Sequence, residues 1–351
     1  MPNIFDLVNA VEIATYYNNN PSNAIPYLGA TLFPPKKQLG LNLSWIKGSK
    51  GLPVALTPAA FDAKATLRDR IGVTKVETEM PFFREAMRIG EKDRQELNKV
   101  LASNNTALIE PIVNNIYDDV TNLVNGAEVQ AERMRMQLLS TGKIAITANR
   151  IAYDYDYKMP ESHKETLLST AMWSATDTAT PVQDIQRWQD KIEEDTGVRP
   201  TRAICSRKTW NYLMANKSIR LDMDPIGGTN RILTDAMLQQ YIQTKLGLTV
   251  AVYNKKFEAT QGGGAVQFFP DEIFTLIPEG NLGNTYYGTT PEESDLMSGN
   301  TDADVQIVNT GVAITTIKEA HPVNVMTVVS AIELPSFENI DRIFIATVHA
   351  A

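Results

Sequence analysis

Residues 111–142, PIVNNIYDDVTNLVNGAEVQAERMRMQLLSTG, carry a long run of helical periodicity. Their apolar side chains recur mostly at steps of three or four residues, which places them on one face of an amphipathic helix: Ile112, Ile116, Val120, Leu123, Ala127, Met134 and Leu138. Proline is tolerated in a first helical turn and glycine commonly ends a helix, so Pro111 and Gly142 mark the two ends. The pattern predicts one helix over about 107–140, on the order of 50 Å long at ~1.5 Å per residue.

Residues 39–80 carry the alternation typical of β-strands instead. Apolar side chains occupy every second position from Leu39 to Trp45, a Gly- and Pro-rich stretch follows at 48–58, and alternation resumes at 61–70. The pattern predicts an extended two-stranded ribbon. Because an isolated ribbon is only marginally stable in water, we expect another chain to cover its apolar face.

The segments on either side of these two elements are less regular. Residues 1–38 show little periodicity and predict an extended arm, since prolines such as Pro34 interrupt any long element. Residues 81–103 predict a short helix. Directly after the long helix, residues 143–158 predict a strand pair with its turn near Ala148.

The second half of the chain has a different sequence pattern. Residues 179–310 alternate helix and strand patterns, with helix starts at Thr180 and Thr234 and helix stops at Gly197 and Gly247. This alternation predicts an α/β or α+β domain around a small sheet. Residues 311–351 predict three strands, which would most simply pack with the earlier strand pair and make 179–310 an insertion. The predicted fold class is α+β.

Composition limits the classes of function. The chain has 351 residues, is 43% hydrophobic and carries a formal net charge of −8, which argues against a dedicated nucleic-acid reader. The single cysteine, Cys205, allows no disulfide within the chain, and a small buried side chain is its expected role. The first residues lack a signal-peptide pattern and no window has ~20 apolar residues, so we expect a soluble protein made in a cytoplasm, without membrane association.

The residues that could form a catalytic, metal or phosphate site are better interpreted as structural residues. His163, His321 and His349 lie far apart without metal-ligand spacing. Asp154 and Asp156 would share one face of a strand whose tyrosines form the other face. Asp302 and Asp304 match only part of a calcium loop. The run from Gly262 to Gly264 lacks the Lys-Ser/Thr of a phosphate loop and predicts a hairpin turn. We therefore expect no enzyme activity, no cofactor and no metal site.

Four stretches, together with the order of elements, resemble a known family: 141–146 (TGKIAI), 195–200 (DTGVRP), 280–293 (GNLGNTYYGTTPEE) and 333–338 (ELPSFE). The chain resembles the lambda-type capsid protein E family of tailed-bacteriophage major capsid proteins, which have the Hong Kong 97-like fold. The resemblance covers nearly the whole chain, and none of its motifs is catalytic.

The resemblance implies a role for each segment. Residues 1–38 would be the N-terminal arm, and 39–80 an extended loop that lies over a neighbouring subunit. Residues 81–178 would be the peripheral domain with the spine helix 107–140. Residues 179–310 would be the axial domain, whose tip meets its copies around five-fold and six-fold centres, and 311–351 would complete the peripheral domain.

The implied function is self-assembly, as pentamers and hexamers, into an icosahedral head shell in the host cytoplasm. The implied partners are a scaffolding protein, a portal protein, optionally a decoration protein, and encapsidated double-stranded DNA held by non-specific proximity. The residues expected to make assembly contacts come from the ribbon and from the glycine turn: Leu41, Leu43, Trp45, Lys47, Lys50, Phe61, Gly262, Gly263 and Gly264.

Three other classes of protein stay open at this point. An encapsulin-like bacterial compartment shares the fold but houses enzymes, and its cargo would distinguish it. An α/β enzyme centred on 179–310 would need a catalytic constellation, which the sequence does not offer. A tail-tube protein fits poorly with the long helix.

Overall fold

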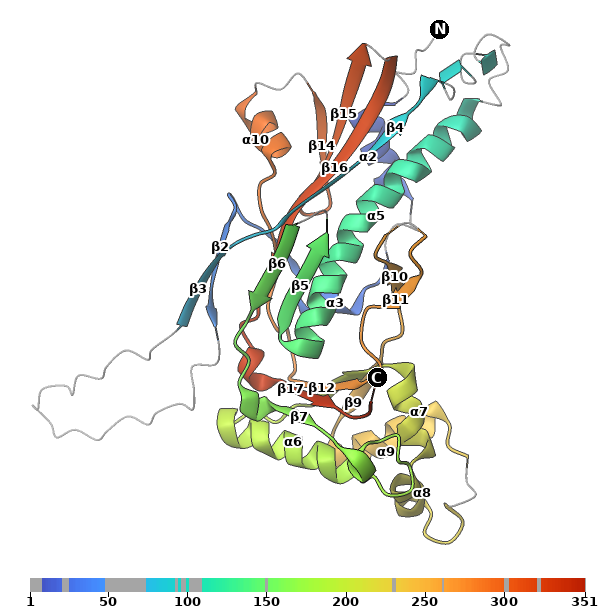
Figure 1. Ribbon diagram of the computed structural model, residues 1–351, viewed down its shortest axis with the longest axis vertical. Coiled ribbons are helices and arrows are strands. Elements are labelled where there is room, and N and C mark those ends of the chain that lie inside the picture. Colours follow the sequence, from blue (N-terminus) through green and yellow to red (C-terminus); the bar gives the residue numbers. More distant parts are fainter. Residues whose placement is uncertain are drawn as a thin grey trace, which may run out of the picture. The chain divides into compact units, whose positions relative to one another are not determined.

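The computed structural model describes residues 8–20, 25–47, 74–91, 94–95, 99–100, 109–148, 151–228, 232–260, 262–299, 303–320 and 323–350. The chain forms two compact units, each assembled from segments that are far apart in the sequence (Figure 1). Unit 1 contains Met1–Ser44, Glu77–Met134 and Asn284–Ser336. Unit 2 contains Trp45–Val76, Arg135–Gly283 and Phe337–Ala351.

Unit 1 is built on a six-stranded sheet whose longest strands lie at its centre. Five strands lie in the order β1 (Pro35–Lys37), β13 (Thr285–Tyr287), β16 (Val323–Pro335), β15 (Val312–Ala320) and β14 (Asp304–Val308). The sixth strand, β4 (Phe82–Ile89), also pairs with β16, outside this order. The antiparallel β15–β16 pair extends from Val312↔Ala331 to Ala320↔Val323, which confirms two of the three strands predicted in the tail.

Two helices cover one face of the unit 1 sheet. Helix α5 (Ile109–Thr141) confirms the predicted long helix, and Gly142 follows it at φ 73°, in the left-handed region that favours glycine. The buried cluster on this face joins α5, helix α2 (Ala10–Asn19) and the sheet. Its members include Val120, Val124 and Val329. Short helix α3 (Leu28–Leu32) and helix α10 (Pro291–Ser298) also belong to unit 1.

Residues 1–38 were expected to have little regular structure. This is wrong for Ala10–Asn19, which form helix α2. Asn9 caps this helix by accepting a hydrogen bond from the Glu12 amide at 2.9 Å. The buried side chains Ala10, Ile13, Ala14 and Tyr17 follow the i, i+3, i+4, i+7 spacing of a helical face. A ten-residue helix is marginal alone, so α2 depends on packing in the unit 1 core.

The predicted helix at 81–103 is wrong at its start. Residues Phe82–Ile89 form strand β4, which pairs antiparallel with β16 from Ile332↔Phe82 to Val325↔Ile89. The long edge of β16 offers backbone hydrogen bonds along the whole of β4. This tertiary pairing overrides the weak apolar spacing on which the helix prediction was based.

Unit 2 contains a five-stranded sheet in the order β7 (Lys164–Thr166), β17 (Phe344–Thr347), β12 (Ile273–Ile277), β8 (Arg202–Cys205) and β9 (Thr249–Val252). Strand β12 is antiparallel to both neighbours, while the β7–β17 and β8–β9 pairs are parallel. Strand β17 confirms the third strand predicted in the tail. It was expected to pack with the 143–158 strand pair, and this is wrong, because it pairs with β7 and β12. Its Phe344 and Ile345 are both buried on opposite faces, as suits an interior strand.

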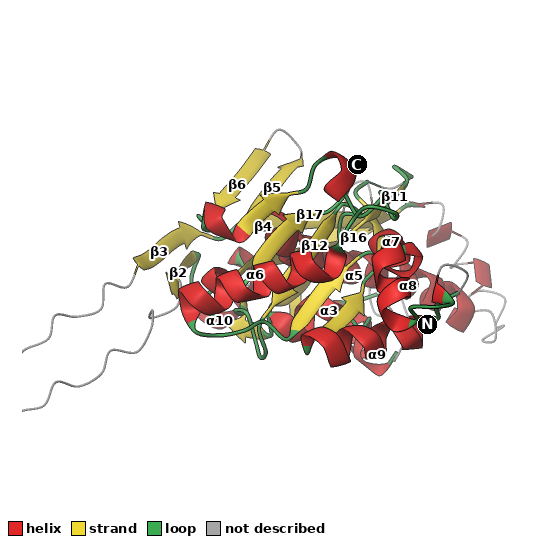
Figure 2. Cartoon of the chain, turned by 90° about the horizontal axis from the view of Figure 1, so that it is seen from below, coloured by secondary structure: helices red, strands yellow, loops and turns green. Residues whose placement is uncertain are grey.

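Four helices cover one face of the unit 2 sheet: α6 (Pro181–Thr196), α7 (Arg207–Ala215), α8 (Lys217–Met223) and α9 (Asp235–Leu246). Helices α6 and α9 lie beside each other (Figure 2). The predicted helix ends are confirmed, because Pro181 opens α6, Thr234 caps α9, and Gly197 and Gly247 follow at positive φ.

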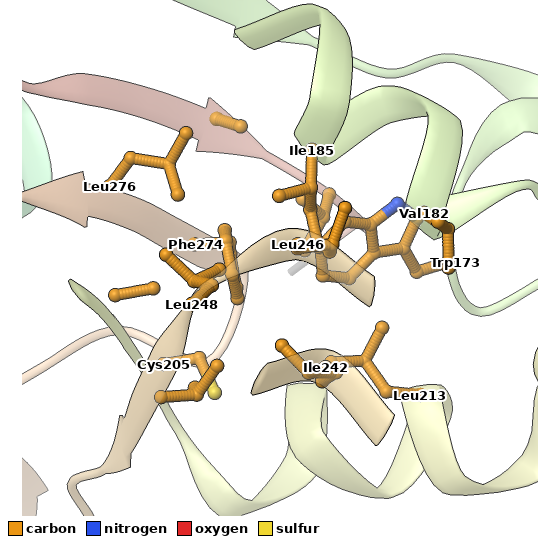
Figure 3. Close-up of a cluster of buried hydrophobic side chains, with 14 of the residues drawn as sticks. Trp173, Val182, Ile185, Cys205, Leu213, Ile242, Leu246, Leu248, Phe274 and Leu276 are labelled. Carbon is orange, nitrogen blue, oxygen red and sulfur yellow. The ribbon is translucent and has the colours of Figure 1, made fainter. Parts of the chain in front are cut away.

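The core of unit 2 is rich in large side chains. The strands contribute Cys205, Phe274 and Leu276, and the helices contribute Val182, Ile185, Leu213, Ile242 and Leu246 (Figure 3). Among the aromatic rings, Trp188 stacks on Phe344 with centroids 5.4 Å apart, and Trp173 meets Phe274 edge-on at 5.0 Å.

Two hairpins complete unit 2. Strands β5 (Lys143–Ala148) and β6 (Ile151–Asp156) form the predicted strand pair, but as a separate two-stranded sheet. Strands β10 (Lys256–Glu258) and β11 (Ala265–Gln267) form the other. The two compact units do not follow the predicted segment boundaries, since residues 284–310 fall in unit 1 and Phe337–Ala351 in unit 2. The arm, loop, peripheral and axial roles of the segments stay predictions.

Candidate functional site

The two described histidines are packed in hydrogen-bonded positions. His163 is buried, and its Nε2 lies 3.0 Å from Oδ2 of Asp195. Hydrogen bonds from Lys191 and from His163 lower the pKa of Asp195. His349 is also buried, with Nε2 2.7 Å from the carbonyl oxygen of Asp271. His321 lies outside the described residues. Within the described ranges, no three His, Cys, Asp or Glu side chains gather as a metal site.

Two of the aspartates singled out in the sequence, Asp156 and Asp304, make local polar contacts. In β6, Asp154 is exposed while Tyr155 is half-buried, which confirms the predicted two-faced strand. Asp156 pairs with Lys143 at 3.0 Å and with Lys158 at 3.1 Å. Asp304 accepts a hydrogen bond from the backbone amide of Ala10 at 2.7 Å, and Asp302 lies outside the described residues. These contacts anchor the hairpin and α2.

Cys205 has no exposed surface, as expected from the sequence. Burial raises the pKa of its thiol far above the usual range, and the reactive thiolate is therefore suppressed. We expect the folded protein to resist a thiol reagent such as 5,5′-dithiobis(2-nitrobenzoate) and the urea-unfolded chain to react with one equivalent. Rapid labelling of the folded protein would contradict this burial.

The ribbon residues expected to contact other subunits divide into two groups. Leu41 is 44% exposed, whereas Leu43 and Trp45 are buried. The indole of Trp45 stacks on Tyr157, with ring centroids 5.4 Å apart, so its apolar surface is already covered within unit 2. Strand β2 (Asn42–Lys47) pairs with β3 (Thr74–Glu79).

The rest of the predicted ribbon is not part of the described structure. The Lys47 side chain, Lys50, Phe61 and the expected return strand at 61–70 all lie outside the described residues. Their role in assembly stays a prediction.

The glycine turn is built as the sequence predicts. It joins β10 to β11, and the Gly262 amide donates a hydrogen bond to Glu258 at 3.1 Å. Gly262 and Gly264 have φ values of 73° and 87°, which favour glycine. Adjacent Gly263 lies so close to Thr260 that a Cβ atom would clash with it.

Sequence reasoning missed several exposed large apolar side chains, among them the two with the largest exposed fractions, Ile226 and Ile232. Ile226 is 98% exposed and Ile232 is 90% exposed, on the connection between α8 and α9. Leu296 and Met297, on α10, are 40% and 66% exposed. The available signal was an isoleucine inside the turn-forming run Asp224-Pro225-Ile226-Gly227, where a polar residue is usual.

None of the helices in the described part of the chain combines the length and the apolar character needed to cross a membrane. The exposed apolar side chains Ile226, Ile232 and Met297 are the candidates for contacts with other protein chains.

The fold is shared with solved phage proteins. A protein assigned as the capsid protein of a prophage of Escherichia coli CFT073 matches with a TM-score of 0.60 and 16% identity, over 97% of this chain and 99% of that one. A phage-related protein of Bordetella bronchiseptica RB50 matches with a TM-score of 0.55 and 12% identity, over 97% of each chain. No curated protein sequence matches significantly.

These matches show the fold, and the expected Hong Kong 97-like fold is confirmed. The model of the family described as phage major capsid protein E matches residues 9–348, so the chain belongs to that family. It is a major capsid protein of the virion shell, which is assembled from many copies.

Proposed function

We propose that pentamers and hexamers of this chain assemble in the host cytoplasm into an icosahedral head shell around double-stranded phage DNA. The family match over residues 9–348 is the observation that carries this proposal. A scaffolding protein would guide assembly, a portal protein would occupy one vertex, and a decoration protein would bind the finished surface. The chain would act through its surfaces, without catalysis. An encapsulin-like compartment is less favoured, because the matching family is one of phage capsids.

Each segment has a proposed part in the shell. The residues between β2 and β3 would form the loop that lies over a neighbouring subunit, and α5 would be the spine of the peripheral part. The unit 2 sheet with α6–α9 would face the five-fold and six-fold centres. The exposure of Ile226 and Ile232 supports a contact there, since burying each would remove a large apolar side chain from water.

Electron microscopy of the expressed protein, with and without its scaffolding protein, tests the proposal. Closed icosahedral shells are the expected result. A protein that stays a stable monomer under both conditions would overturn it, and native particles loaded with an enzyme in place of DNA would favour the compartment.

The acidic balance predicts weak adsorption of DNA by the shell. With 33 basic and 41 acidic residues, the chain has no excess of cations to displace counterions from phosphates. Purified empty shells mixed with double-stranded DNA at roughly physiological salt should retain almost none of it in a filter-binding assay. A basic DNA-binding protein is the positive control, and tight, salt-sensitive binding by the shells would refute this prediction.

A further inference from the structure

The hairpin of β5 and β6 is a sheet of only two strands, and the outer edge of β5 is already covered (Figure 1). The Ala145 amide donates a hydrogen bond to Gln137 Oε1 at 3.2 Å, and Gln137 Nε2 donates one to the Ala145 carbonyl at 3.1 Å. The Lys143 amide donates a hydrogen bond to Thr141 Oγ1 at 3.2 Å. Two side chains from the end of α5 therefore take the place of a third strand along β5.

The outer edge of β6 has no such cover. Ala145 lies opposite Asp154, and the backbone of Ala145 bonds to Gln137, so this is a pair without hydrogen bonds between the two strands. The amide and carbonyl of Asp154 therefore point away from β5, as do those of Ala152 two residues earlier. Among the described contacts, these backbone groups have no partner, and both residues are exposed. Such an open edge is a template for a further strand.

An apolar row follows the same edge. On β5, Ile144 and Ile146 are buried. Opposite them on β6, Tyr155 and Tyr153 are half-buried, and their rings stack with centroids 6.2 Å apart. Ile151, which continues the row, is 54% exposed. Burial thus decreases from β5 to β6, and a strand added beside β6 would cover the exposed part of the row.

The edge of β6 is complementary to a second copy of itself. In an antiparallel pairing centred on Tyr153, Ala152 of each copy lies opposite Asp154 of the other, and the open backbone groups of both residues meet. Ile151 then lies opposite Tyr155, which is a favourable β-branched and aromatic cross-strand pair. A pairing centred on Asp154 would instead set two carboxylates directly opposite each other, which is destabilising.

Charge favours the same register. Arg150 precedes β6 in the sequence, so continuing the pairing by one residue sets it opposite Asp156 of the other copy. Asp154 faces an alanine, so no like charges are directly opposed. Opposite charges across neighbouring strands stabilise a sheet and fix its register.

We propose that β6 pairs with β6 of a second copy of this chain, centred on Tyr153, to form one four-stranded sheet across a two-fold axis. The inference rests on the proposed shell, because icosahedral symmetry relates its copies by two-fold axes. A two-fold contact uses the same surface on both partners, as this edge does. A strand of six residues is much smaller than the roughly 20–30 residues a side of a stable interface. The pairing therefore forms in the shell and leaves the free subunit monomeric.

Cross-linking tests the pairing. Tyr153→Cys places one thiol of each copy at the two-fold axis, where the paired Cα atoms would lie ~4.5 Å apart, within reach of a disulfide. Mild oxidation of shells from this variant should give disulfide-linked dimers, with buried Cys205 silent. Thr147→Cys is the matched control, because it is exposed on β5 of the same hairpin. Three strand spacings, roughly 14 Å, would separate its thiols, which is too far for a disulfide.

Two proline substitutions test the backbone bonds. Ala152→Pro removes an amide that points away from β5, so the unassembled subunit should keep its circular dichroism spectrum and its melting temperature. Its shells should dissociate at a lower urea concentration than shells of the unmodified chain, or fail to close. Thr147→Pro makes the same change directly opposite, on the edge of β5, and its shells should match the unmodified ones.

Two results would overturn the pairing while leaving the shell function intact. One is the absence of linked dimers in oxidised Tyr153→Cys shells, and the other is an equal urea midpoint for shells of the two proline variants. Failure of the unmodified chain to form any shell would instead overturn the proposed function, and the pairing with it.

Discussion

Replacing Trp188 with alanine is expected to destabilise unit 2 by about 3–5 kcal/mol, the usual cost of truncating a buried tryptophan. Trp188 is 1% exposed and stacks on Phe344 at 5.4 Å and on Trp173 at 5.9 Å. Its indole nitrogen also donates a hydrogen bond to Glu165, so the substitution removes packing and a polar anchor of β7. Urea unfolding of the unassembled subunit, followed by circular dichroism, measures the loss.

Trp188→Phe is the matched control for this prediction. It keeps an aromatic ring against Phe344 and loses the hydrogen bond to Glu165, so we expect a smaller loss of about 1–2 kcal/mol. If both substitutions lowered the free energy of unfolding equally, the hydrogen bond rather than the aromatic stack would dominate the contribution of Trp188 to the stability of unit 2.

Deleting residues 48–60 is expected to abolish closed shells and to leave both compact units folded. The deletion removes none of the residues in the two large sheets or in their buried clusters. The proposed function places this segment over a neighbouring subunit, and its loss would remove that contact from every pair of copies. Electron microscopy measures shell formation, and thermal unfolding of the monomer measures folding.

A variant in which residues 48–60 are replaced by a Gly-Ser stretch of equal length is the control for chain connectivity. It should also fail to form shells, because the apolar and basic side chains are absent while the reach of the segment is kept. Normal shells from either variant would refute the role proposed for this segment.

The parts of the fold that the sequence predicted correctly are those governed by local signals. The periodicity behind Ile112 predicts α5, and the proline and glycine ends predict α6, because capping and amphipathic spacing act within a few residues. Strand β4 could not be predicted in this way. Its conformation depends on pairing with β16, which is about 240 residues further along the chain.

Helix α2 shows a different reason for failure. Its apolar spacing from Ala10 to Tyr17 was present in the sequence, but the Asn- and Pro-containing residues behind it favoured an irregular arm. The candidate contact residues stay a prediction, for a related reason. Alternation predicts that Leu43 and Trp45 are apolar positions of a strand, but it does not tell whether the same subunit or another covers them.

The long-range pairing of both sheets has a consequence for synthesis of the protein. In unit 1, Ile89 of β4 can pair only after Val325 of β16 has been synthesised. In unit 2, Lys164 of β7 can pair only after Ile345 of β17 has been synthesised. At roughly 5–20 residues per second on the ribosome, the early strands of both units remain without their partners for many seconds. A chain terminated before Phe344 lacks β17, and therefore cannot complete the unit 2 sheet. The fold thus acts as a quality check, because unit 2 can present finished surfaces to a growing assembly only after translation has passed β17.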